Sequence, residues 1–220
     1  MASANGYYPI CLALTGRPCL VVGGGRVAQQ KITTLLRYGG DVTVVSPTLT
    51  PRVRRWARQG RLRYHRRTFR ASDVTGKWLV YGATDDPITQ QVVFRAAQRR
   101  KIFVNIVDVP TLCTFIAPAQ IKRGPLTIAI TTGGRSPGMA KRVRKEIQRV
   151  IGPEYAALTR LLERLRPTIR QIGRTPQERK RLVDRLVYGG LLEQLRRGNR
   201  RHTQARVKRL LKQVMGKNLP

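Results

Sequence analysis

The stretch Cys19-Leu-Val-Val-Gly-Gly-Gly-Arg-Val-Ala28 decides the fold of the first part of the chain. An apolar run typical of a buried strand ends in glycines, and residues 27–38 continue with apolar side chains at helical spacing. In Gly23-x-Gly25-x-x-Ala28, the first glycine permits a tight turn, the second lets the backbone approach a pyrophosphate, and the small third residue allows close packing. Between a strand and a helix, this pattern predicts a Rossmann-type dinucleotide-binding turn over Gly23, Gly24, Gly25, Arg26, Val27 and Ala28. A glycine-rich turn that binds no nucleotide is the alternative.

The alternation of short apolar runs and helical stretches continues to about residue 107. Strands are predicted at 41–46, 61–66, 78–83 and 102–107, and helices at 51–59 and 86–100. The run 102–107 is nearly all apolar, which predicts a central place in the sheet. The pattern is that of an α/β fold with a parallel sheet covered by helices.

Beyond Pro110 the pattern changes. Residues 115–121 and 126–132 read as two strands joined by a hairpin-type connection, and Ser136-Pro137 caps a helix that ends near residue 152. From Glu154 onward the chain reads as helical throughout. We therefore predict a Rossmann domain over 1–112, a strand-and-helix segment over 113–152, and an α-helical C-terminal domain over 153–220.

Composition limits the classes of function. Forty-four Lys and Arg residues against eleven Asp and Glu residues give a net charge of +33, which attracts polyanions such as nucleic acid or a small polycarboxylate. No run reaches the roughly 18 apolar residues of a membrane span. The first residues, Met1-Ala-Ser-Ala-Asn-Gly, lack the features of an export signal, so the cytoplasm is the expected location.

The metal-binding residue types are sparse. Cys11, Cys19 and Cys113 form no CxxC pair, and His65 and His202 have no neighbour at ligand spacing. We therefore expect reduced thiols and no metal site.

Polar residues follow three of the predicted strands at the edge where parallel sheets bind ligands. In this fold an acidic residue after the second strand usually hydrogen-bonds to the adenine ribose. Here Ser46-Pro47-Thr48 occupies that position. Ser46 or Thr48 could bind a ribose hydroxyl, whereas Arg52 or Arg54 could meet a 2′-phosphate, so the residues leave NAD and NADP both open. The fourth strand ends in Thr84-Asp85-Asp86, in which Asp86 is expected to cap the following helix and Asp85 to be freer.

Asp108 follows the fifth predicted strand at the same edge. In a chain so poor in acids, a carboxylate there is a candidate for proton transfer, and a loop-capping aspartate is the equal alternative.

Five motifs in consistent order resemble the siroheme synthase family, and more closely its precorrin-2 dehydrogenase and sirohydrochlorin ferrochelatase module. They are Gly23-Gly-Gly-Arg-Val-Ala28 with Lys31, Ala83-Thr-Asp-Asp86, Asn105-Ile-Val-Asp-Val-Pro110, Phe115-Ile-Ala-Pro118 and Thr132-Gly-Gly-Arg-Ser-Pro137. The resemblance covers about residues 7–150, and the helical remainder fits the family's C-terminal region.

The resemblance implies oxidation of precorrin-2 to sirohydrochlorin with NAD as hydride acceptor. It leaves open whether the chain also inserts Fe²⁺, as a substrate, or is a dehydrogenase only. It implies that Asp108 is the acid/base residue and that Arg26, Val27, Pro47 and Thr48 contact NAD. It further implies a homodimer formed through the middle segment, with a polycarboxylate tetrapyrrole as substrate. Because the sequence ends at Pro220, no methyltransferase domain is expected, and hence no synthesis of precorrin-2.

A second hypothesis comes from a different class. Basic helices at 52–58 and 141–149 and the basic C-terminal tail would suit a nucleic-acid-binding regulatory protein that has kept a Rossmann shell. No reading motif or aromatic stacking platform accompanies them, so we expect nucleic acid to bind only through incidental electrostatic attraction.

Overall fold

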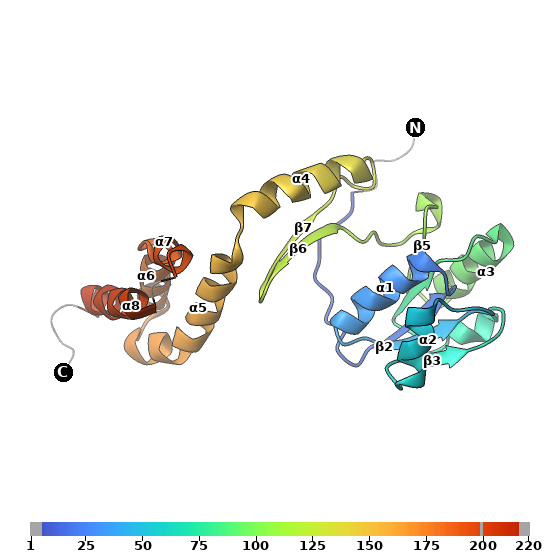
Figure 1. The fold of residues 1–220 in the computed structure, drawn as a ribbon, viewed down its shortest axis with the longest axis horizontal. Helices are drawn as coiled ribbons and strands as arrows, with labels where there is room; N and C mark the ends of the chain where they lie inside the picture. Colours follow the sequence, from blue (N-terminus) through green and yellow to red (C-terminus); the bar gives the residue numbers. More distant parts are fainter. Residues whose placement is uncertain (1–5, 199, 216–220) are drawn as a thin grey trace. The chain divides into compact units, whose positions relative to one another are not determined.

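The computed structural model describes residues 6–198 and 200–215 (Figure 1). Most of the N-terminal stretch examined for an export signal therefore lies outside the described residues. The chain divides after Ala117 into two compact units, residues 1–117 and 118–220, which are described separately below. Within the described residues, no helix is long and apolar enough to cross a membrane.

The first unit contains one five-stranded sheet in which every pairing is parallel. The spatial order is β3-β2-β1-β4-β5, so β1 lies at the centre and the chain crosses from one half of the sheet to the other between β3 and β4. The strands are β1 (Pro18–Val22), β2 (Asp41–Val45), β3 (Arg63–His65), β4 (Leu79–Gly82) and β5 (Phe103–Ile106). This is the Rossmann-type arrangement that the sequence predicts.

Helices cover both faces of this sheet. They are α1 (Arg26–Arg37), α2 (Pro51–Arg58) and α3 (Pro87–Gln98), with short 3-10 turns at η1 (Ala71–Val74) and η2 (Pro110–Leu112). Alternate residues of β1 belong to opposite layers: Val21 shares one buried cluster with α1 and α2, and Leu20 shares the other with α3. The central strands are therefore buried on both sides, which explains their unbroken apolar runs.

The predicted central position of the fifth strand is wrong. β5 lies at the edge of the sheet, paired only with β4. Its outer edge is covered by the chain returning after η2, where Asn105 forms an antiparallel bridge with Cys113 and the Thr114 N–H donates to the Val104 carbonyl at 2.8 Å. Because the returning segment covers the outer edge of β5, this edge strand is buried like a central strand. Its sequence is therefore as apolar as that of a central strand. The same segment delays the next strand, which begins at Ala119 rather than at Phe115.

The second unit begins with an antiparallel hairpin of β6 (Ala119–Arg123) and β7 (Leu126–Ile130). The helix α4 (Pro137–Val150) follows, with Ser136 as its N-cap: the Ser136 hydroxyl accepts from the Met139 N–H at 3.2 Å. These elements match the predicted hairpin and capped helix.

Four further helices complete the second unit: α5 (Pro153–Ile172), α6 (Pro176–Tyr188), α7 (Leu191–Arg196) and α8 (Arg200–Met215). They share a buried cluster that includes Leu182, Leu186 and Leu191. Thr175 and Glu178 form the capping box predicted at the start of α6. The division of this region at residue 152 into a separate segment and domain stays a prediction.

Candidate dinucleotide-binding site

The glycine turn after β1 packs so closely on neighbouring loops that two of its residues cannot carry a side chain. Gly23 has a φ of +114°, and a Cβ atom built there would lie 2.1 Å from the Ala83 carbonyl oxygen. A Cβ atom on Gly24 would lie 1.9 Å from the Thr48 carbonyl oxygen. The turn therefore requires glycine at both positions, and it lies directly against the ends of β2 and β4.

Gly25 differs from its two neighbours. It is exposed, its φ is −77°, and a Cβ atom built on it would meet nothing within 4 Å. It is the N-cap of α1, no side chain caps the helix there, and the first turn contains no acidic residue. The first N–H groups of a helix have no intrahelical partner and carry partial positive charge, so this open end suits an anionic ligand. Arg26 and Val27 are exposed beside it, whereas Ala28 is buried in the helix–sheet contact.

The loop after β2 forms the second wall of the site. Ser46 is buried, Pro47 and Thr48 are exposed, and the Thr50 N–H donates to the Gly24 carbonyl at 3.0 Å. The Tyr64 hydroxyl donates to the Ser46 carbonyl at 3.0 Å, which ties the loop to β3. The loop thus lies at the place where the adenine ribose binds in this fold, without the usual carboxylate.

The loop after β4 separates its two aspartates as predicted. The Asp86 carboxylate accepts from the Ile88 N–H at 3.2 Å and from the Thr89 N–H at 3.1 Å, which caps α3. These bonds, and above all the one from the Thr89 hydroxyl, lower the pKa of Asp86. Asp85 is exposed, and the Thr84 carbonyl accepts from the Gln90 amide at 2.8 Å. Asp86 is therefore structural, and Asp85 is left exposed in the loop that follows β4.

Asp108 occupies a turn directly after β5. Its φ is +63°, a left-handed conformation that aspartate tolerates better than most residues, and its side chain is exposed. Within the described residues no group donates a hydrogen bond to its carboxylate. The neighbouring polar residue, Asn105, is buried and donates to the Phe115 carbonyl at 2.9 Å. Asn105 therefore holds the returning segment in place, and the Asp108 carboxylate caps no loop.

Lys31 is the residue of this edge to which the sequence reasoning assigned no role. It lies on α1, half-buried, with Nζ 5.2 Å from the centroid of the Tyr81 ring. Burial lowers the pKa of Lys31, and the charges of Asp108 and Cys113 oppose that shift. Lys31 follows the buried Ala28 by three residues, which places both residues on the same side of α1. A lysine on the apolar side of a helix is the feature of the sequence that could have identified Lys31.

The predicted residues thus converge on one edge of the sheet. Because all five strands are parallel, the loops after β1, β2, β4 and β5 emerge at the same edge, and the close approaches of Gly23 to Ala83 and of Gly24 to Thr48 join three of these loops. The loop after β5 emerges beside the loop after β4, because these two strands pair directly in parallel.

Cys19 is buried and Cys113 is partly buried. Burial raises the pKa of Cys19 to about 11 and also raises that of Cys113. Within the described part of the chain, no group of three or more His, Cys, Asp or Glu residues is arranged to hold a metal ion.

These features define a Rossmann-type dinucleotide-binding protein. Comparison with known proteins gives the family. The model of a putative NAD(P)-binding family matches residues 10–119, and that of the central segment of sirohaem biosynthesis proteins matches residues 123–149. The chain belongs to this NAD(P)-binding family, and the resemblance to siroheme synthases that its motifs indicated is confirmed. A nicotinamide dinucleotide cofactor is likewise confirmed.

Individual relatives agree. The chain is 39% identical over 190 residues to a siroheme synthase of Methylobacillus flagellatus, covering 86% of this chain and 41% of that protein. It is 37% identical over 204 residues to a siroheme synthase of Xylella fastidiosa, covering 92% and 42% respectively. The chain thus spans about two fifths of the length of these relatives. Among solved structures, SirC, a precorrin-2 dehydrogenase, superposes with a TM-score of 0.77 at 26% identity, covering 93% of this chain and 98% of that one.

Proposed function

We propose that this chain is an NAD-dependent precorrin-2 dehydrogenase, which oxidises precorrin-2 to sirohydrochlorin in siroheme biosynthesis. The observation that carries the proposal is the exposed Asp108 carboxylate, without a hydrogen-bond donor in the described structure, on the same sheet edge as the glycine turn. The likeness to a precorrin-2 dehydrogenase over nearly the whole of both chains supports it.

The glycine turn fits the cofactor. Its open position is Gly25, where the backbone can come within hydrogen-bond distance of a pyrophosphate, and the uncapped start of α1 adds N–H donors. Ser46 and Thr48 offer hydroxyl groups at the ribose position, and Thr84 and Asp85 line the opposite wall. When bound here, NAD⁺ supplies the acceptor for the hydride that leaves the substrate.

Asp108 handles the proton that the dehydrogenation releases. A carboxylate that accepts no hydrogen bond from the described residues is available to take a proton from a bound substrate. Its left-handed turn fixes the direction of the side chain at the cost of backbone strain, as is common at functional sites. Lys31 acts beside Asp108: the carboxylate of Asp108 opposes the lowering of the Lys31 pKa by burial, so a charged ammonium group is favoured at this edge of the site.

The net charge of +33 suits a tetrapyrrole with many carboxylate side chains. With 44 Lys and Arg residues against 11 Asp and Glu residues, most of the arginines and lysines cannot be neutralised by acids. The positive potential that results would draw a polycarboxylate toward the protein and raise its association rate.

The direct test is an anaerobic assay with precorrin-2 and NAD⁺, in which sirohydrochlorin absorbance and NADH fluorescence are followed together. The proposal predicts that both signals rise in equal molar amounts and that neither rises without NAD⁺. Absence of sirohydrochlorin in the complete mixture would reject the dehydrogenase. Insertion of Fe²⁺ into the product stays a prediction, and its rate against the uncatalysed rate tests it.

We further propose that the enzyme acts as a homodimer in the cytoplasm. A two-stranded hairpin is marginal by itself, and only Ala140 of α4 is buried, while Met139 and Val150 are 51% and 64% exposed. A second copy of the chain would cover these apolar side chains. Analytical ultracentrifugation should give twice the chain mass of 24.9 kDa, and a monomer at micromolar concentration would contradict the proposal.

A further inference from the structure

The chain beside the cofactor site is unusually basic. From Ser46 to Arg70 it contains nine arginines and no acidic residue. We propose that the site accepts NADP⁺ as well as NAD⁺, and that Arg54 and Arg66 bind the 2′-phosphate that distinguishes the two cofactors. The inference rests on the cofactor site of the proposed function.

The loop after β2 contains no acidic residue that would repel a phosphate. In NAD-specific sites of this fold, a carboxylate at the end of β2 accepts hydrogen bonds from the ribose hydroxyls and repels a 2′-phosphate. Ser46 occupies that position, and Pro47 and Thr48 beyond it are exposed and uncharged. Two acids on the neighbouring chain are engaged elsewhere: Asp41, at the start of β2, pairs with Arg63, and Asp73 pairs with Arg67 at 2.6 Å.

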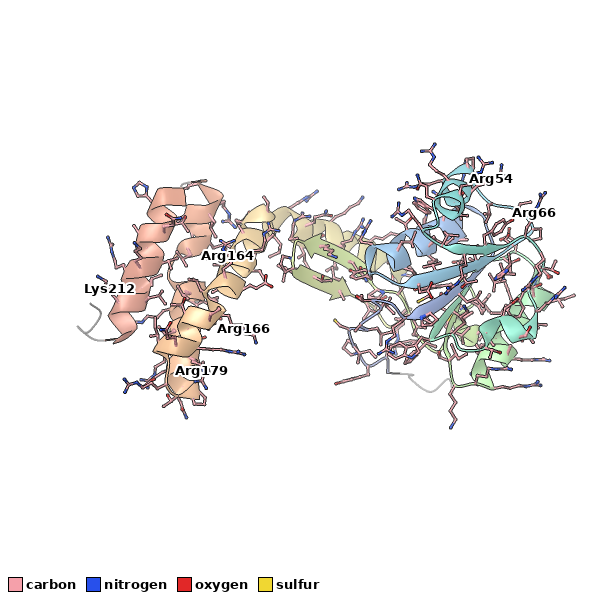
Figure 2. All side chains as sticks on the ribbon, turned by 90° about the horizontal axis from the view of Figure 1, so that it is seen from below. Arg54, Arg66, Arg164, Arg166, Arg179 and Lys212 are labelled. Carbon is pink, nitrogen blue, oxygen red and sulfur yellow. The ribbon has the colours of Figure 1, made fainter. Side chains whose placement is uncertain are left out.

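Arg54 is held at this loop by the structure. Its Nη2 donates to the Leu49 carbonyl at 3.3 Å, so the guanidinium group lies beside residues 46–49 although the side chain is exposed. Arg66 reaches the same place from the neighbouring strand, because it directly follows His65, whose carbonyl accepts from the Ser46 N–H at 3.2 Å. Figure 2 shows both side chains on the α2 and β3 side of the first unit. The loop where a 2′-phosphate would project is thus contacted by the Arg54 guanidinium group, and Arg66 belongs to the chain that leaves β3 beside this loop.

Several other arginines of this segment make contacts away from the loop. Arg52 and Arg61 stack on the Trp56 ring, at 4.9 and 5.6 Å from its centroid, and with Arg55 they line a separate groove. Arg67 makes two bonds to the Asp73 carboxylate. The structure therefore favours Arg54 over Arg52, and it adds Arg66, which lies too far along the sequence to be associated with the loop by spacing.

The test is isothermal titration of the full chain with NAD⁺, NADP⁺, 5′-AMP and adenosine 2′,5′-bisphosphate. The last two probes isolate the contribution of the 2′-phosphate. The variants are Arg54→Gln and Arg66→Gln, and Arg55→Gln is the matched control, since it removes the same charge from the same helix on the side of the Trp56 groove. The Arg66 side chain makes no hydrogen bond within the described residues, so Arg66→Gln remains informative if Arg54→Gln disturbs the loop.

We expect NADP⁺ to bind wild type within about tenfold of NAD⁺, and adenosine 2′,5′-bisphosphate to bind more tightly than 5′-AMP. Each of the two variants should weaken NADP⁺ about tenfold and NAD⁺ less than twofold, as expected for loss of a charge-assisted hydrogen bond to phosphate. The Arg55→Gln variant should leave the ratio of the two affinities unchanged.

The inference is overturned if NADP⁺ binds a hundredfold more weakly than NAD⁺, or if both variants bind NADP⁺ like wild type. It is also overturned if Arg55→Gln weakens NADP⁺ as much as they do, because general charge would then explain the effect. In each of these cases NAD⁺ still binds and the proposed dehydrogenase stands. If neither dinucleotide binds, the proposed cofactor site itself is rejected.

Discussion

Substituting Gly25 by alanine should separate cofactor binding from folding. A methyl group at this position meets no protein atom within 4 Å, and the backbone, with a φ of −77°, is one that alanine adopts freely. Loss of glycine's extra freedom in the unfolded chain stabilises by about 0.4–1 kcal/mol, whereas alanine is a poorer N-cap than glycine by about 0.5–1 kcal/mol. The two effects nearly cancel, so the free energy of unfolding should change by less than about 1 kcal/mol.

The same methyl group would fill the space through which the pyrophosphate approaches the backbone. Losing one or two charge-assisted hydrogen bonds, each of about 1.5–3 kcal/mol, corresponds to a loss of at least tenfold in dinucleotide affinity. Titration with NAD⁺ measures the affinity, and urea unfolding measures the stability. Gly24→Ala is the contrasting variant: its Cβ atom would lie 1.9 Å from the Thr48 carbonyl oxygen, and the overlap should cost about 1–3 kcal/mol of stability.

The reasoning is refuted if Gly25→Ala binds NAD⁺ within twofold of wild type. It is also refuted if Gly25→Ala destabilises the protein as much as Gly24→Ala does, because the open space at Gly25 would then not exist.

Three further predictions concern charge. Burial lowers the pKa of Lys31 below its ordinary 10.5, so the charged amine costs stability at neutral pH and the cost is relieved as the pH rises toward 10.5. Lys31→Met should therefore unfold at the same or a higher temperature at pH 7, yet oxidise precorrin-2 about tenfold more slowly; a lower melting temperature with full activity would contradict this. The hydrogen bond from Arg67 lowers the pKa of Asp73 below its ordinary 3.8, so its contribution is present above that value and lost as the pH falls through the lowered pKa. Asp73→Asn should be less stable than wild type at pH 7, and the difference in urea midpoint should shrink by pH 3; a constant difference would show that the ion pair is not the cause. Finally, kcat/KM for the tetrapyrrole should fall several-fold between about 50 and 300 mM salt with kcat nearly unchanged, because screening weakens attraction between separated charges. A salt-independent kcat/KM would remove electrostatic steering from the account.

Much of the fold follows from local patterns. The glycine turn, the capped starts of α2, α3, α4 and α6, and the apolar runs of the sheet each depend on neighbouring residues, and all lie where the sequence places them. The position of β5 at the edge of the sheet could not be predicted from local patterns. Its outer edge is covered by the returning segment, and this depends on pairing between Asn105 and Cys113. An apolar strand has the same composition whether a strand or a loop covers its edge.

The candidate dinucleotide-binding site could likewise be predicted only in part from the sequence. Gly23, Ser46, Thr84 and Asp108 could be found because parallel strands bring their following loops to one edge. The proposed role of Lys31 could not, since its place over the Tyr81 ring of β4 arises only when α1 packs on the sheet. The choice between Arg52 and Arg54 likewise required the structure, because stacking on Trp56 decides which way Arg52 points.

The role of Asp108 as the proton acceptor is the central claim, and its left-handed backbone determines the best variant to test it. Asparagine tolerates a φ of +63° far better than alanine, so Asp108→Asn removes the charge with little strain. The decisive measurement is the single-turnover rate of sirohydrochlorin formation from precorrin-2 and NAD⁺ for wild type and Asp108→Asn at saturating cofactor. The account predicts a loss of about a hundredfold or more in the variant, with an unchanged dissociation constant for NAD⁺. Equal rates for the two proteins would contradict it.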